Sequence, residues 1–205
     1  MTQTNKKAPK IMVIRHAEKP TTNPTTNGVD INGDQNADSL IPQGWQRAGA
    51  LATLFAPSKG PLQHPNLATP KFIYATKSPD PTEGNRPEQT VTPLVAKLQK
   101  QAGKSEALLE PNFTFKKGKE VQLVNSAMSC DGVVLISWPH GRIPYLAKQI
   151  PLSKHSKPIP KGKWPSNRFD MVWVFDYDTK SKRGGYKFSQ VPQLLLAGDS
   201  SEPLT

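Results

Sequence analysis

The chain has 205 residues with a mean hydropathy of −0.57 and 21 prolines, which predicts one domain with a lean core and long loops. Nowhere does it approach the roughly 20 consecutive apolar residues that a membrane-spanning helix needs. Its net charge of +11 favours anionic partners, either a small phosphorylated ligand or a polyanion. We expect a single domain over residues 1–205, with flexible tails at 1–9 and 199–205.

The first ten residues are polar and lack the apolar core of a secretory signal. The single cysteine, Cys130, cannot form an internal disulfide, which is typical of a reducing compartment. Both features predict a cytoplasmic protein.

The stretch Lys10–Glu18, KIMVIRHAE, predicts a strand over the apolar run Ile11–Ile14. Its four consecutive apolar residues are typical of a strand buried on both faces of a sheet. Arg15 and His16 follow at the carboxyl end, where open α/β sheets bind ligands. By itself an Arg-His pair after an apolar run is weak support for catalysis.

The next elements alternate between helix and strand. Residues Pro20–Leu40 have no periodicity and predict a long loop. A helix follows from Pro42 to Phe55, then a strand at Lys71–Thr76. After the turn-rich residues 77–85, Arg86 precedes a helix from Pro87 toward Leu98.

The middle of the chain repeats this alternation. Phe113–Phe115 is a candidate short strand, and the helix after it would bury Val121, Val124 and Met128. Gly132–Ser137 is the second unbroken apolar run and predicts a fully buried strand. It ends at Trp138-Pro139-His140-Gly141, and a helix from Pro144 to Ile150 is expected next.

The C-terminal part predicts a loop at Lys154–Ser166 and then a hairpin of Asp170–Tyr177 with Lys187–Val191. The alternation of strands and helices indicates an α/β fold with a mostly parallel sheet, helices on both faces and an antiparallel edge hairpin.

Four side chains follow the carboxyl ends of these strands: Arg15, His16, Arg86 and His140. In a parallel sheet they would share one rim. Arginine donors match the oxygens of a phosphoryl group, and a neutral imidazole can attack phosphorus. The sequence therefore predicts a phosphate site.

The segments IRHAEKP, IPQGWQRAGALATLF, NRPEQT and SWPHG together resemble the histidine phosphatase superfamily, which includes the phosphoglycerate mutases. The resemblance covers Lys10 to Ile150 and has Ala17 where the family commonly has glycine, which makes it the Arg-His-x-Glu variant. It implies a phosphoglycerate mutase-like fold and a metal-independent phosphatase without cofactor. His16 would be the phosphorylated nucleophile, and Arg15, Arg86 and His140 would complete the phosphate pocket.

The family's acid for the leaving group is not identified by any motif. Five carboxylic acids are candidates: Glu18, Glu88, Glu110, Glu120 and Asp131. An acid typically contributes ~10²–10⁴-fold, so hydrolysis of good leaving groups does not require it.

Three alternatives stay open at this point. The first is a phosphate-binding protein of the same fold with little turnover, and the second is a mutase-type phosphotransferase. The third is a nucleic-acid-binding protein, which the charge supports but the scattered lysines, without interleaved aromatic residues, make the weakest of the three.

Overall fold

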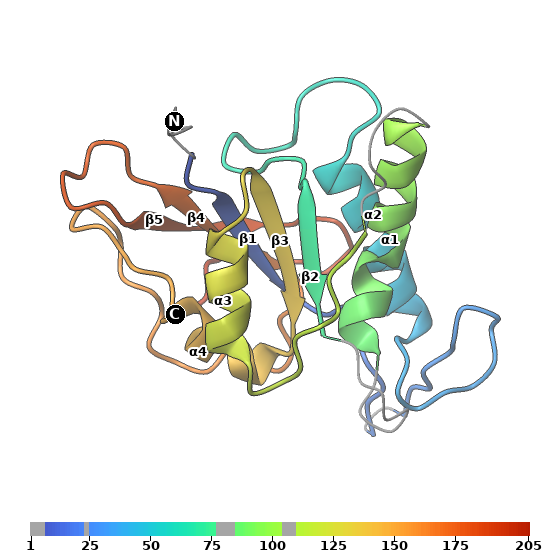
Figure 1. Ribbon diagram of the computed structural model, residues 1–205. Helices are drawn as coiled ribbons and strands as arrows, with labels where there is room; N and C mark the ends of the chain where they lie inside the picture. Colours follow the sequence, from blue (N-terminus) through green and yellow to red (C-terminus); the bar gives the residue numbers. More distant parts are fainter. Residues whose placement is uncertain (1–6, 23–24, 77–84, 104–109) are drawn as a thin grey trace.

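The computed structural model describes residues 7–22, 25–76, 85–103 and 110–205. Its centre is a five-stranded sheet in the order β2-β3-β1-β4-β5 (Figure 1). The first three strands of that order are parallel, and the last two form an antiparallel hairpin at one edge. The strands are β1 (Lys10–Arg15), β2 (Phe72–Ala75), β3 (Val133–Trp138), β4 (Met171–Tyr177) and β5 (Tyr186–Pro192). The predicted α/β class, the largely parallel sheet and the edge hairpin are confirmed.

Helices cover both faces of the sheet. α1 (Pro42–Phe55) and α2 (Arg86–Ala102) pack against one face. α3 (Glu120–Met128) and the short α4 (Ile143–Ala147) pack against the other. A single 3₁₀ turn, η2 (His140–Arg142), joins β3 to α4.

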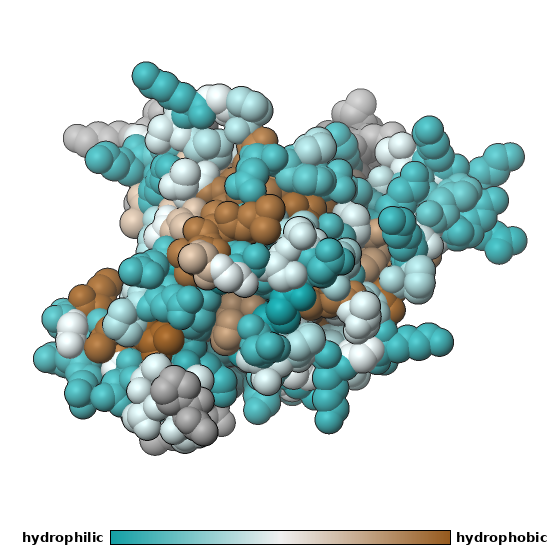
Figure 2. Space-filling model, turned by 180° about the vertical axis from the view of Figure 1, so that it is seen from behind, coloured by the Kyte–Doolittle hydropathy of each residue, from teal (hydrophilic) through white to brown (hydrophobic). Residues whose placement is uncertain are grey.

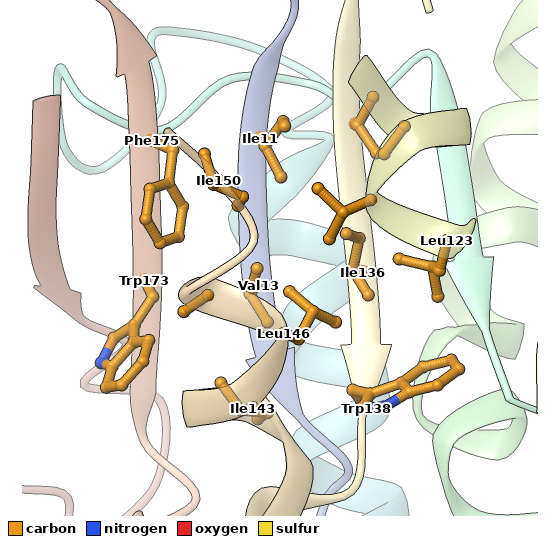
Figure 3. Close-up of a cluster of buried hydrophobic side chains, with 14 of the residues drawn as sticks. Ile11, Val13, Leu123, Ile136, Trp138, Ile143, Leu146, Ile150, Trp173 and Phe175 are labelled. Carbon is orange, nitrogen blue, oxygen red and sulfur yellow. The ribbon is translucent and has the colours of Figure 1, made fainter. Parts of the chain in front are cut away.

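The unbroken apolar runs are explained by this two-sided cover. In β1, Ile11 and Val13 belong to the cluster under α3 and α4, whereas Met12 and Ile14 belong to the cluster under α1 and α2. Figure 3 shows Ile11 and Val13 among side chains of β3, β4 and the overlying helices. Because a strand covered on both faces buries every residue, its sequence loses the alternation of a half-exposed strand.

Two sequence predictions in the middle of the chain are wrong. Phe113–Phe115 is not a strand; the neighbouring Asn112 forms an isolated bridge to Tyr74 beside β2. In α3 the buried face contains Glu120 and not Val121, which is 39% exposed. An acidic residue can occupy that face because it is paired inside the protein, as described below.

The C-terminal residues are not the predicted flexible tail. Leu204 is buried in the core, and its backbone N–H donates to Oε1 of Gln190. Asp199 is held by Arg47 of α1. At the other end, residues 1–6 and the predicted turn at 77–84 lie outside the described residues, and Pro9 is already buried. The single-domain assignment of 1–205 stays a prediction.

In the part of the chain that the structure describes, none of the helices combines the length and the apolar character that crossing a bilayer requires.

Candidate active site

The parallel pairing of β1 and β3 brings two of the predicted residues together. Arg15 is opposite Trp138 in the register, and the backbone N–H of His16 donates to the carbonyl of Trp138 at 3.3 Å. His140 follows two residues later in η2. Its ring centroid lies 6.4 Å from that of His16, with the planes at 79°.

His16 is buried in a defined tautomer. Its side chain is 5% exposed, and Nδ1 lies 2.7 Å from the carbonyl oxygen of Ala17. Since a carbonyl can only accept, Nδ1 carries the proton and Nε2 keeps a lone pair. Burial, followed by the charges of Arg15 and Arg86, lowers the pKa of His16 to about 3. The imidazole is therefore neutral at pH 7 and is nucleophilic at Nε2.

Arg15 is a buried cation that forms no ion pair with a carboxylate among the described residues, although the charge of Glu18 favours its protonated form. Its Nη1 donates to the backbone carbonyls of Pro165, Ser166 and Arg168, at 3.2, 2.8 and 3.0 Å. The ring of Phe169 covers the guanidinium carbon at 3.6 Å. Nε and Nη2 are buried and have no hydrogen-bond partner among the described residues.

This environment leaves Arg15 charged and short of acceptors. Burial lowers the pKa of its guanidinium to about 9, which still keeps it protonated at pH 7. Two buried N–H donors without acceptors are costly in a folded protein. A bound anion would satisfy both donors and the charge.

Arg86 is the first residue of α2 and bonds to the loop before α1. Its Nη2 donates to the carbonyl of Ala37 at 2.8 Å, and its Nε donates to that of Ser39 at 3.3 Å. Asp38 lies 3.8 Å from Nη2. The guanidinium is near enough to His16 that its charge contributes to the lowered pKa of that imidazole.

His140 is neutral for the same reasons as His16. Burial, and then the charges of Arg15 and Lys19, lower its pKa to about 4. The turn that carries it is fixed by Arg142, which donates from Nε and Nη2 to the two carboxylate oxygens of Glu120, at 2.8 and 2.6 Å. Trp138 donates to the same carboxylate at 3.2 Å.

Thr90 connects the end of β1 to the start of α2, although from the sequence it was only part of the NRPEQT segment. Its hydroxyl accepts from the backbone N–H of Ala17 at 2.8 Å and donates to the carbonyl of Arg86 at 2.7 Å. The side chain is fully buried. Through these two bonds Thr90 links Ala17, whose carbonyl oxygen fixes the His16 tautomer, to the first turn of α2. No spacing pattern in the sequence distinguishes such a threonine from an ordinary helix residue.

The candidate acids lie in different environments. Glu18 accepts three hydrogen bonds from Arg47, at 2.7, 2.9 and 3.1 Å. Burial acts against ionisation of Glu120, but its bonds from Arg142 and other donors prevail and lower its pKa to about 2. Asp131 lies at the opposite end of the sheet beside Lys71, and Glu110 is exposed.

Glu88 differs from the others in its position. It lies on the first turn of α2 and, with Asp38 and Asn85, lines a cleft of about 400 Å³.

Histidine, cysteine, aspartate and glutamate side chains form no group of three suited to a metal ion within residues 7–22, 25–76, 85–103 and 110–205.

No protein-family model and no curated protein matches the chain. Among solved structures it is similar to a phosphoserine phosphatase of Entamoeba histolytica at 14% identity, which covers 92% of this chain and 99% of that one with a TM-score of 0.42. It is also similar to a mycobacterial glucosyl-3-phosphoglycerate phosphatase at 14% identity, with 91% and 98% covered and a TM-score of 0.44. A mycobacterial hydrolase matches at 12% identity, with 90% and 97% covered and a TM-score of 0.45. At these TM-scores the structural similarity is loose.

Proposed function

We propose that the chain is a phosphatase that hydrolyses a small phosphorylated substrate through a phosphohistidine at His16. The observation that carries this proposal is the buried Arg15, whose Nε and Nη2 have no hydrogen-bond partner among the described residues. The next residue, His16, is neutral and keeps a lone pair on Nε2. A phosphoryl group supplies both the acceptors that Arg15 lacks and the electrophile that Nε2 can attack.

The first step forms one bond and breaks another. Nε2 of His16 attacks phosphorus, the P–O bond to the leaving group breaks, and the leaving oxygen takes the bonding electron pair. Arg15, Arg86 and His140 donate hydrogen bonds to the phosphoryl oxygens, on which charge develops in the transition state. In the second step water attacks phosphorus, the P–N bond breaks, and inorganic phosphate and free His16 are formed.

The leaving oxygen must acquire a proton unless it is stable as an anion. We assign this role to Glu88, which lies on the first turn of α2 two residues after Arg86 and lines a cleft with Asp38. An E88Q variant should therefore lose turnover of alkyl phosphates while keeping that of nitrophenyl phosphate.

The decisive experiment is single-turnover hydrolysis of nitrophenyl phosphate by wild-type protein and H16N. We expect H16N to lose turnover by ~10³-fold or more, and the wild type to show an acid-labile phosphohistidine by mass spectrometry of the quenched reaction. His64, a histidine in the loop before β2 that accepts from the N–H of Asn66, provides the matched control H64N. Near wild-type turnover by H16N would exclude the proposed nucleophile.

A second function deserves the same experiment, because Glu18 and Glu120 are both unavailable as acids. In this alternative the site binds phosphate without efficient turnover. Binding of orthovanadate together with no burst of nitrophenol would favour it over the phosphatase. Transfer of the phosphoryl group to an added alcohol in preference to water would instead indicate a mutase-type phosphotransferase.

A further inference from the structure

The charge of this chain is unevenly distributed. Residues 151–187 contain nine of its 27 lysines and arginines and three of its 16 aspartates and glutamates, so they hold +6 of the net charge of +11. In the sequence these cations form two separate groups, before β4 and between β4 and β5. The fold determines whether they meet.

The backbone brings the two groups together at the outer edge of the hairpin. Ser153 donates its N–H to the carbonyl of Tyr186 at 2.9 Å, and Tyr186 donates to the carbonyl of Pro151 at 2.8 Å. The N–H of Phe188 donates to Oγ of Ser156 at 2.8 Å. Residues 151–156 therefore run beside β5, next to the turn at 178–185 (Figure 1).

Asp178 holds the two groups in place. Its carboxylate is 1% exposed and accepts from Nδ1 of His155 at 2.8 Å. Nζ of Lys187 lies 3.3 Å from its other oxygen. The buried acid therefore joins the segment before β4 to both ends of the β4–β5 turn.

Five exposed cations lie on the segment and the turn that this acid joins, and we call them the hairpin patch: Lys154, Lys157, Lys180, Lys182 and Arg183. None of them has a carboxylate within ion-pair distance among the described residues. Figure 2 shows extended hydrophilic side chains along the edge of the molecule where the hairpin lies. Holding like charges together on one edge costs free energy, which a bound polyanion would recover.

We infer that the hairpin patch binds the sugar-phosphate backbone of a single-stranded nucleic acid. Lysine and arginine side chains neutralise successive phosphates without reading sequence. Tyr177, at the end of β4, is 43% exposed and offers a ring beside the patch on which a base can stack. Stacking of this kind requires bases that are not already paired, which favours a single strand over a duplex.

A membrane surface fits the patch less well. The turn at 178–185 reads DTKSKRGG and has no apolar side chain that could insert between lipids. The patch also lies at the end of the sheet opposite to His16, because β4 runs antiparallel to β1 and Tyr177 lies beyond the pair Ile11–Phe175. Binding at the patch is therefore separable from hydrolysis at the proposed active site.

The test is fluorescence anisotropy of a labelled thymidine oligonucleotide with the full chain, titrated over a range of sodium chloride. With five cations engaged, the slope of log K against log salt should be roughly −3 to −4. The charge-reversal variant K180E/R183E should bind at least ~10-fold more weakly at low salt and show a slope shallower by about 1.4. The control K116E/K117E changes the same net charge in an exposed loop before α3 and should keep both values.

The stacking residue is tested separately with Y177L, which keeps an apolar side chain against Tyr186. We expect roughly 10-fold weaker binding to the thymidine oligonucleotide and no change for a duplex. All hairpin variants should hydrolyse nitrophenyl phosphate as the wild type does, so failure here and failure of the proposed phosphatase are distinguishable. Three outcomes would overturn the inference: no salt-dependent binding, an equal loss in K116E/K117E, or binding to phosphatidylserine vesicles without binding to the oligonucleotide.

Discussion

Two buried arginines of this protein are embedded in opposite ways. Arg47 in α1 is 3% exposed and Arg15 at the end of β1 is fully buried. Arg47 donates to Glu18, to Asp199 and to Oε1 of Gln193, so its charge is compensated by two carboxylates. Arg15 has backbone carbonyls on one nitrogen and no described partner on its other two.

The two environments have opposite effects on the guanidinium. Burial disfavours the charge of Arg47, but hydrogen bonds to Asp199 and Glu18 outweigh it, and the pKa rises. Burial dominates at Arg15, and its pKa falls to about 9. The charge of Arg47 is neutralised by Glu18 and Asp199 within the protein. Two nitrogens of Arg15 have no acceptor among the described residues, so a bound anion could supply one. This contrast distinguishes the candidate site from the rest of the interior.

The largest expected effect is on activity, from R15M. Methionine fills a similar volume without charge, so we expect kcat/KM for nitrophenyl phosphate to fall by ~10³-fold, as for loss of a transition-state donor. The free energy of unfolding should fall by no more than about 1–3 kcal/mol, because the loss of the hydrogen bonds to the carbonyls of Pro165, Ser166 and Arg168 is offset by removal of a buried charge. Steady-state kinetics and urea denaturation of the same preparation measure both. A large loss of stability with little change in kcat/KM would mean that Arg15 serves the fold.

The converse change, R47M, should act on stability. It leaves Glu18 and Asp199 buried without their cation, and breaking a buried pair in this way costs about 3–5 kcal/mol. Urea denaturation followed by tryptophan fluorescence measures the loss, and kcat per folded molecule should stay within a few-fold of the wild type. A variant as stable as the wild type but inactive would reverse the roles assigned to the two arginines.

The sequence allowed the fold to be predicted and the candidate site to be placed at the strand ends, because both depend on local patterns. The apolar runs of β1 and β3 require two covered faces, and Arg15, His16 and His140 follow directly from the ends of those strands. Their roles in catalysis stay a prediction until the substitutions above are made.

Features that depend on contacts distant in the chain could not be predicted. Glu120 reads as a surface glutamate until Arg142 and Trp138 are placed against it, and Asp199 reads as part of a polar tail until Arg47 reaches it. In both cases a buried ion pair reverses the usual exposure of a charged residue. The partner of such a pair is 22 to 152 residues away in sequence and has no periodic signature.

The protonation of His16 depends on the charge of the neighbouring Arg15. An ordinary histidine with a pKa of about 6.5 would be neutral in roughly one molecule in 30 at pH 5. Burial and the charge of Arg15 lower the pKa of His16 to about 3, so its ring should still be neutral there. NMR titration of the ring should show no protonation down to pH 5 in the wild type and R47M, and titration at a higher pH in R15M. Protonation near pH 6.5 in the wild type would contradict the buried, cation-flanked environment assigned to His16.

The smallest expected effect is that of T90V, which removes the hydroxyl between Ala17 and Arg86 at nearly constant volume. We expect kcat for nitrophenyl phosphate to fall by about 5-fold, since the His16 ring and Arg86 lose their common support. The unpaired N–H of Ala17 should also cost about 1–3 kcal/mol of stability. T90S keeps the hydroxyl and should restore kcat.

A purely structural role for Thr90 makes a different prediction from a positioning role. The control is T90S, which keeps the hydroxyl that bonds to Ala17 and Arg86. If Thr90 only stabilises α2, then T90V should lower the unfolding free energy and leave kcat per folded molecule unchanged. If it positions the site, kcat falls in T90V alone and T90S recovers it, because the serine hydroxyl can still accept from Ala17 and donate to Arg86. The ratio of kcat between T90V and T90S therefore separates positioning from stability, even when both variants are less stable than the wild type.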